Sequence, residues 1–95
     1  MAQRPPPTPM LQAFVSAAQT GSFARAAFEL NLTASAISHQ IAGLEEWWGV
    51  QLFERHSRGV NLTTAGQALL PVTDDFFKTL ETVLHSLNPR KSQPL

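Results

Sequence analysis

Residues 22–48 read SFARAAFELNLTASAISHQIAGLEEWW, and this stretch decides the fold. It contains two helix patterns separated by a short break. Ser22 and Thr33 each precede a run with apolar residues at spacings of three and four, and a hydroxyl side chain in that place caps a helix. Asn31 tolerates the left-handed conformation that ends a helix. The stretch therefore predicts two helices joined by a tight turn, which is a helix-turn-helix.

The second of these helices, predicted over residues 34–48, has two different faces. The major groove of B-DNA is about 12 Å wide, so a helix that enters it needs a slim face with hydrogen-bonding groups. The other face must be apolar, because it has to pack against the rest of the domain. The slim face holds Ser35, Ser38, His39 and Ala42, and the apolar face holds Ile37, Ile41 and Leu44.

The flanking segments predict a small, mainly helical domain with one β-hairpin. Residues 9–20 indicate a first helix, which Thr8 caps and Gly21 ends. Residues 50–63 alternate around a Gly-containing turn, and this pattern is typical of two short strands. Arg58 at the tip makes the hairpin a candidate wing that reaches the DNA backbone or an adjacent minor groove.

A long helix is predicted after the hairpin, over residues 64–88. At 1.5 Å per residue it measures about 37 Å, which exceeds a globule of roughly 60 residues. Part of it therefore needs a second chain, and Pro71 predicts a kink or a local break. Its heptad-like apolar positions are the expected homodimer contacts: Leu69, Phe76, Leu80, Val83 and Leu87.

Composition excludes several other classes of protein. The chain has 95 residues, enough for one small domain, and no Cys, which excludes a disulfide scaffold and a cysteine nucleophile. No apolar run reaches the roughly 18 residues that span a bilayer. The histidines share no metal-ligand spacing, and catalytic motifs are absent. We expect a cytoplasmic protein that is not an enzyme and needs no metal or cofactor.

Four segments resemble the DNA-binding domain of LysR-type transcriptional regulators: GSFARAAFEL, TASAISHQIAGLE, GVQLFER and VNLTTAGQALL. They occur in the order and at the spacing of that family, and the resemblance runs from about residue 11 to about residue 87. The lead-in RPPPTPMLQAF and the tetrapeptide SHQI resemble the branch of glycine-cleavage and β-lactamase regulators. The resemblance implies a winged helix-turn-helix followed by a linker helix that forms a homodimer on double-stranded DNA.

The resemblance also implies a division of the chain and a role for each part. We expect an extended or disordered lead-in over 1–8, a DNA-binding domain over 9–63, a dimerisation helix over 64–88 and a flexible tail over 89–95. A small-molecule effector would act only through a domain absent from this chain. The recognition helix, about 33–48, is expected in the major groove, and the wing, about 55–60, on the backbone or minor groove. The implied DNA-binding residues are Ser22, Arg25, Thr33, Ser35, Ser38, His39, Arg55 and Arg58.

The net charge of the predicted DNA-binding segment is the main observation against DNA binding. Residues 22–63 hold three cationic and four anionic side chains, a net charge of −1, whereas affinity for DNA comes largely from neutralised phosphates. The arginines must therefore share one face, away from Glu45 and Glu46. Arg55 has an alternative as a surface ion pair with Glu54 or Glu45. The alternative function is a helical protein-interaction module that uses the 64–88 helix without DNA binding.

Overall fold

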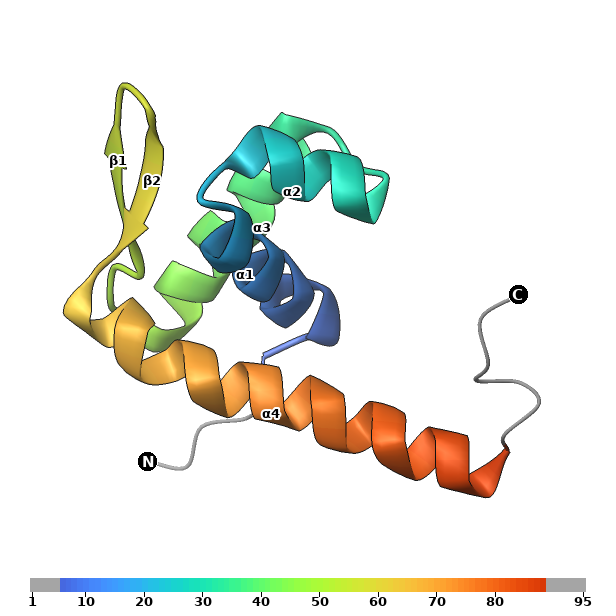
Figure 1. Cartoon of the computed structure of the whole chain (residues 1–95). Coiled ribbons are helices and arrows are strands. Elements are labelled where there is room, and N and C mark those ends of the chain that lie inside the picture. The colour runs from blue at the N-terminus through green and yellow to red at the C-terminus, as the bar shows by residue number, and fades with distance from the viewer. Residues whose placement is uncertain (1–5, 89–95) are drawn as a thin grey trace.

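The structure, a computed structural model, describes residues 6–88. Over this part, three short helices form one unit, a β-hairpin stands beside it, and a long helix runs beneath both and extends past them (Figure 1). The predicted fold class, mainly helical with a small hairpin, is confirmed. Residues 1–5 of the predicted lead-in and the predicted tail, 89–95, lie outside the described residues. The elements are α1 (Thr8–Thr20), α2 (Phe23–Leu30), α3 (Ala34–Trp48), β1 (Phe53–His56), β2 (Gly59–Leu62) and α4 (Thr64–Leu87).

Capping residues fix both ends of α2 and the start of α3. The Ser22 hydroxyl accepts a hydrogen bond from the Arg25 backbone N–H at 3.1 Å, and the Thr33 hydroxyl accepts one from the Ala36 N–H at 3.0 Å. Asn31 ends α2 in the left-handed conformation, with φ of 57°. All three residues occupy the positions that the sequence predicts.

The start of α1 differs from the prediction by one residue. Thr8 is the first residue of the helix rather than its cap, and Pro7 takes the cap position without a side-chain hydrogen bond. A proline-rich first turn needs less capping, because proline has no N–H to satisfy and its φ already suits a helix. α1 therefore begins at Thr8, and Gly21 ends it with φ of 70° as predicted.

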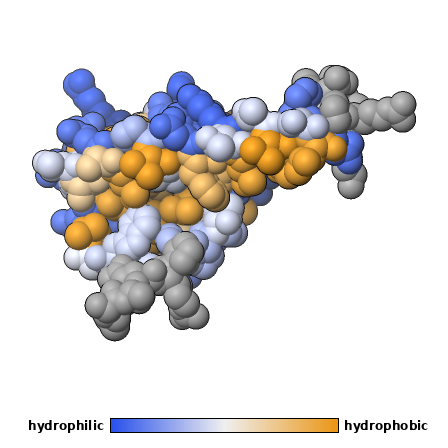
Figure 2. Space-filling model, turned by 90° about the horizontal axis from the view of Figure 1, so that it is seen from below, coloured by the Kyte–Doolittle hydropathy of each residue, from blue (hydrophilic) through white to orange (hydrophobic). Residues whose placement is uncertain are grey.

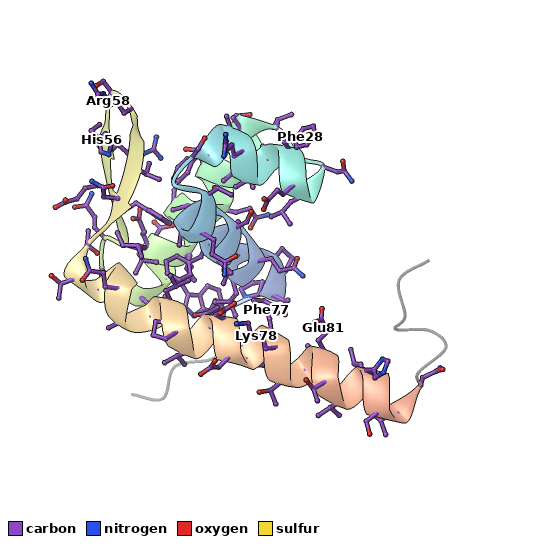
Figure 3. All side chains as sticks on the ribbon, viewed as in Figure 1. Phe28, His56, Arg58, Phe77, Lys78 and Glu81 are labelled. Carbon is purple, nitrogen blue, oxygen red and sulfur yellow. The ribbon has the colours of Figure 1, made fainter. Side chains whose placement is uncertain are left out.

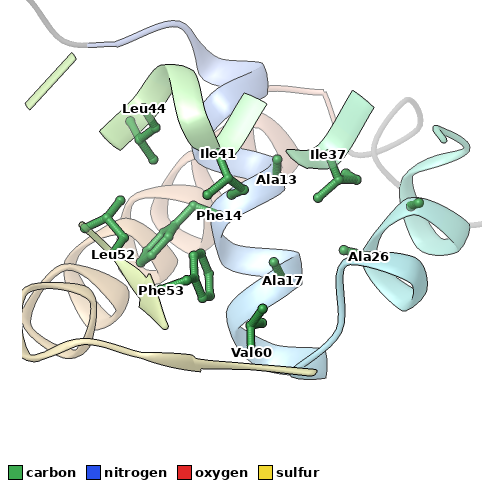
Figure 4. Close-up of a cluster of buried hydrophobic side chains, with 11 residues drawn as sticks. Ala13, Phe14, Ala17, Ala26, Ile37, Ile41, Leu44, Leu52, Phe53 and Val60 are labelled. Carbon is green, nitrogen blue, oxygen red and sulfur yellow. The ribbon is translucent and has the colours of Figure 1, made fainter. Parts of the chain in front are cut away.

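Small side chains bring the first three helices close together around one apolar core (Figure 4). Alanines of α1 and α2 are fully or almost fully buried where these helices meet. The predicted apolar face of α3 is buried too, and Trp48, the last residue of the helix, is half-buried and packs at the edge of the core. The core consists of Ala13, Phe14, Ala17, Ala26, Ala27, Ile37, Ile41, Leu44, Leu52, Phe53 and Val60.

The predicted hairpin is present and is attached to the helical unit. β1 and β2 pair antiparallel, with Phe53 opposite Leu62 and Arg55 opposite Val60. The Val60 N–H donates to the Gly21 carbonyl at 3.2 Å. Gly59, beside this contact, has φ of 142°, and a side chain there would overlap the same carbonyl oxygen. Only glycine fits this close approach of two backbones.

α4 is one continuous helix through Pro71, so the predicted local break is absent. The first half packs against α1 and β2, while the second half extends beyond the core (Figure 1). Leu69, one of the predicted dimer contacts, is half-buried and packs against the core of its own domain. The other predicted contacts are exposed: Phe76, Leu80, Val83 and Leu87.

The junction between the hairpin and α4 requires glycine at position 66. A Cβ there would overlap the Leu52 carbonyl oxygen and come within 2.7 Å of Leu62 Cδ2. Helix propensity alone favours alanine by up to about 1 kcal/mol. We predict that Gly66→Ala instead lowers the free energy of unfolding by about 1–3 kcal/mol, because the overlap involves backbone. Urea denaturation followed by circular dichroism measures this.

The neighbouring exposed residue provides the control. Gln67→Ala should change the free energy of unfolding by less than about 0.5 kcal/mol. A Gly66→Ala protein as stable as the original would show that the junction is looser than described.

Candidate nucleic-acid interface

The outward face of α3 is slim and polar. Ser35 and His39 are exposed, Ser38 is half-buried, and Ala42 continues the same face as an exposed small residue. The Thr33 hydroxyl lies 3.2 Å from that of Ser35. The apolar residues of α3 point the opposite way, into the core (Figure 4). The helix therefore presents hydrogen-bonding groups to the outside while its back is held by the domain.

The hairpin projects from the domain beside these helices. Figure 3 labels His56 and Arg58 at its far end, well away from the core. Both side chains are exposed, and the Arg58 backbone N–H donates to His56 Nδ1 at 3.3 Å. The Arg58 guanidinium is thus carried at the tip of an arm, as the sequence predicts.

Strand alternation separates the charges of β1. Neighbouring residues of a strand point to opposite faces of the sheet. Phe53 and Arg55 lie on the face of the hairpin that packs on the helices, opposite the buried Val60, and Glu54 lies on the other face. An arginine and a glutamate adjacent in sequence are therefore directed to different sides of the wing.

Arg55 makes two contacts that were not predicted from the sequence. Its Nη2 donates to the Ser38 hydroxyl at 2.9 Å, and its guanidinium carbon lies 4.8 Å from the centre of the Phe23 ring. The side chain therefore joins the wing to α3 and to the start of α2, instead of pairing with Glu54 or Glu45. Side chains alternate between the two faces of a strand, so the apolar Phe53 could have predicted that Arg55, two residues along, faces the helices.

Glu45, one of the four acidic residues in the charge count, has a structural role inside the domain. Its carboxylate Oε2 accepts hydrogen bonds from the backbone N–H groups of Leu52, at 2.8 Å, and Phe53, at 3.2 Å. The carboxylate thus fastens the start of β1 to the last turns of α3. Glu46, next to it, is exposed near the same C-terminal end of α3, several turns from Ser35.

The remaining predicted contacts lie at the start of α2. Ser22 is half-buried and caps the helix, while Arg25 is exposed in the first turn. Glu29, the next acidic residue along α2, accepts a hydrogen bond from Ser16 of α1 at 2.9 Å. Two of the four acidic side chains between residues 22 and 63 are thus engaged within the domain.

The second half of α4 carries an exposed apolar stripe. Figure 2 shows it as a hydrophobic band along this helix. A groove lies beside it, lined by Val15, Leu30 and several α4 residues. Lys78 pairs with Asp74 at 3.1 Å, and the hydrogen bond and charge of Asp74 raise the pKa of Lys78. The exposed apolar residues of this helix are Val72, Phe76, Leu80, Val83, Leu84 and Leu87.

Within residues 6–88, no three His, Asp or Glu side chains gather closely enough to hold a metal ion. None of the helices described is both long and apolar enough to cross a membrane.

A helix-turn-helix with a hairpin wing and an outward recognition helix defines a winged-helix DNA-binding domain. The bacterial regulatory helix-turn-helix family, lysR type, matches residues 9–67, and the chain belongs to this family. Members of this family that resemble the chain are transcriptional regulators, not enzymes.

Two curated relatives are named as the transcriptional activator AmpR. The chain is 46% identical over 87 residues to AmpR of Citrobacter freundii, which covers 92% of this chain and 30% of that protein. It is 47% identical over 78 residues to AmpR of Pseudomonas aeruginosa, which covers 82% of this chain and 26% of that protein. The chain therefore spans less than a third of the length of these relatives.

Solved structures of the same family share the fold. Oxidized OxyR of Corynebacterium glutamicum superimposes with a TM-score of 0.84 at 32% identity, covering 92% of this chain and 28% of that one. The DNA-binding domain of CbnR, solved in complex with DNA, gives a TM-score of 0.74 at 32% identity, covering 92% and 97%. The BenM DNA-binding domain, solved in complex with benA site 1 DNA, gives a TM-score of 0.81 at 29% identity, covering 95% of this chain and 100% of that one.

The attachment of the wing by Glu45 is directly testable. We predict that Glu45→Ala lowers the free energy of unfolding by about 1.5–3 kcal/mol, because two backbone donors lose a charged acceptor. Thermal denaturation followed by circular dichroism measures the loss.

Glu46→Ala removes an equal charge one residue along and is the matched control. It should leave stability within about 0.5 kcal/mol of the original. Equal effects from the two substitutions would contradict a specific role for the Glu45 carboxylate.

Proposed function

We propose that the chain binds duplex DNA sequence-specifically as a homodimer, with α3 in the major groove and the wing on the backbone or minor groove. The observation that carries this proposal is the exposed polar face of α3 beside an arginine-tipped hairpin. The CbnR and BenM domains, which share the fold, are named as complexes with DNA. Because duplex DNA is the proposed partner, the cytoplasm is the proposed location.

The distribution of charge supports DNA binding despite a formal net charge of +0. Arg25 and Arg58 are exposed at the start of α2 and at the wing tip. Glu45 is bonded to the backbone, and Glu54 lies on the outer face of the hairpin. The N-termini of α2 and α3 add backbone donors and positive dipole ends that favour phosphates.

We assign base contacts to the face of α3 and phosphate contacts to its surroundings. Ser35, Ser38 and His39 offer short polar groups to base edges, because a slim helix face reaches the floor of the groove. Backbone contacts position such a helix without reading sequence. The proposed phosphate contacts are Ser22, Arg25, Thr33, Arg55 and Arg58.

The proposed homodimer uses the exposed stripe of α4. Four of the five predicted positions are exposed, and Val72 and Leu84 extend the same exposed surface. Exposed apolar area of this kind is stabilised when a second apolar surface covers it. Two linked recognition helices bind successive major grooves about one helical turn apart, and their linkage multiplies weak single-site affinity. The four positions are Phe76, Leu80, Val83 and Leu87.

DNA binding is tested by selection from a random duplex pool and by the slope of log affinity against log salt. We predict an enriched motif and a clearly negative slope. The double variant Ser38→Ala, Arg58→Ala should lose the enrichment and reduce the slope by about one phosphate contact.

The alternative function predicts a different outcome. If α4 is a protein-interaction helix and the helix-turn-helix is only a scaffold, the double variant behaves like the original chain. A slope indistinguishable from zero and no enriched motif would rule out the proposed function.

Dimerisation has its own test. We predict that Leu80→Glu makes the chain monomeric in sedimentation velocity, because a carboxylate is placed in the apolar stripe. Its affinity for a two-half-site duplex should fall by about a hundredfold or more, through loss of linkage.

Thr82→Glu adds the same charge at an exposed residue on the opposite side of the helix and should leave the dimer intact. A Leu80→Glu protein that remains dimeric would show that another surface joins the two copies.

A further inference from the structure

Arg55 is held by three elements of the domain. It lies on the hairpin face that packs on the helices, opposite Val60. Its Nη2 donates to Ser38 of α3 at 2.9 Å, and its guanidinium lies over Phe23 of α2 at 4.8 Å from the ring centre. A guanidinium has a rigid, planar set of donors that suits stacking and directed hydrogen bonds together. These contacts hold the Arg55 side chain beside the polar face of α3.

The Phe23 ring on which Arg55 stacks is itself fixed. It meets the Phe53 ring edge-on, with ring centres 5.5 Å apart and planes at 88°. Phe53 is buried in the core, and the Phe23 ring beneath the guanidinium packs against that core. Arg55, although exposed, therefore links the wing to Ser38 through a ring that packs against the core.

The Arg55 bond determines what the Ser38 hydroxyl can do. A hydroxyl has one donor and two acceptor positions. The Arg55 N–H occupies an acceptor position, so the O–H is directed elsewhere. Helical hydroxyls often donate to the carbonyl four residues earlier, as Thr73 does to Leu69 at 2.9 Å. Within residues 6–88, the hydrogen bonds of Ser38 include no such donation, which leaves its proton available.

We propose that Arg55, besides the phosphate contact proposed for its remaining donors, is a positioning residue that holds Ser38 as a hydrogen-bond donor to an acceptor atom on a base edge. In the major groove guanine presents two acceptors, N7 and O6, whereas cytosine presents only the N4 donor. Guanine is therefore favoured at the base facing Ser38. Cytosine is disfavoured because its N4 amino group could use only the remaining acceptor position of the hydroxyl and would bring a partly positive group near the Arg55 cation. The nearby cation also polarises the hydroxyl and strengthens it as a donor. This inference rests on the proposed function and names the base chemistry that the site reads.

The test measures base preference with three proteins. The duplex selected by the original chain is varied one base pair at a time, and binding of the original chain, Ser38→Ala and Arg55→Met is compared. The base pair facing Ser38 is identified as the one whose preference Ser38→Ala abolishes. We expect guanine there to bind about three- to tenfold more tightly than cytosine, as one hydrogen bond allows. We expect Arg55→Met to lose the same preference.

Arg58→Met is the matched control for loss of an arginine on the wing. It should reduce the salt slope by about one while keeping the base preference, because Arg58 is proposed on a phosphate. Arg55→Lys keeps the charge without the planar fork, and it should fail to restore the preference. Thermal denaturation of each variant checks that the domain remains folded.

Three results would overturn the inference while leaving the proposed function intact. These are an Arg55→Met protein that keeps the guanine preference, a cytosine preference at the Ser38 position, or no position that depends on Ser38. Failure of the original chain to bind any duplex would instead contradict the proposed function itself.

Discussion

The ring of Phe53 lies between Phe14 of α1 and Phe23 of α2, with ring centres 5.6 Å and 5.5 Å away, and the wing depends on this contact. A two-stranded hairpin alone is at best marginally stable in water. Here one buried aromatic side chain joins it to two helices, and the Glu45 carboxylate holds the backbone leading into β1. Helix and wing therefore form one unit rather than two elements joined by a linker.

The same arrangement explains how a chain of zero formal net charge can present a surface suited to DNA. The domain uses its acidic groups internally or turns them away: Glu45 caps backbone donors, Glu29 accepts from Ser16, and Glu54 lies on the outer face of the hairpin. Basic groups remain at the start of α2 and at the wing tip. The direction in which charges point matters more than their sum, because contacts with phosphates are local.

Much of this architecture could be predicted from the sequence, and the reasons are local. Ser22, Thr33 and Asn31 act on backbone groups within a few residues, so their roles are visible in the chain itself. The apolar face of α3 follows from helical spacing. The roles of Arg55 and Glu45 were not predicted, because their partners lie 17 residues and seven to eight residues away, and side-chain direction depends on the packed fold. The heptad-like spacing also could not separate Leu69, which packs on its own core, from the exposed residues that follow it.

We propose above that the polar face of α3 and the wing tip together form the surface that contacts DNA. The most direct measurement is a titration of isotope-labelled protein with its selected duplex, followed by amide chemical shifts in NMR spectra. We expect the largest shifts in the first two turns of α3 and in the turn between β1 and β2. Shifts centred on the C-terminal end of α3 or on the exposed face of α4, with the first turns of α3 unchanged, would contradict it.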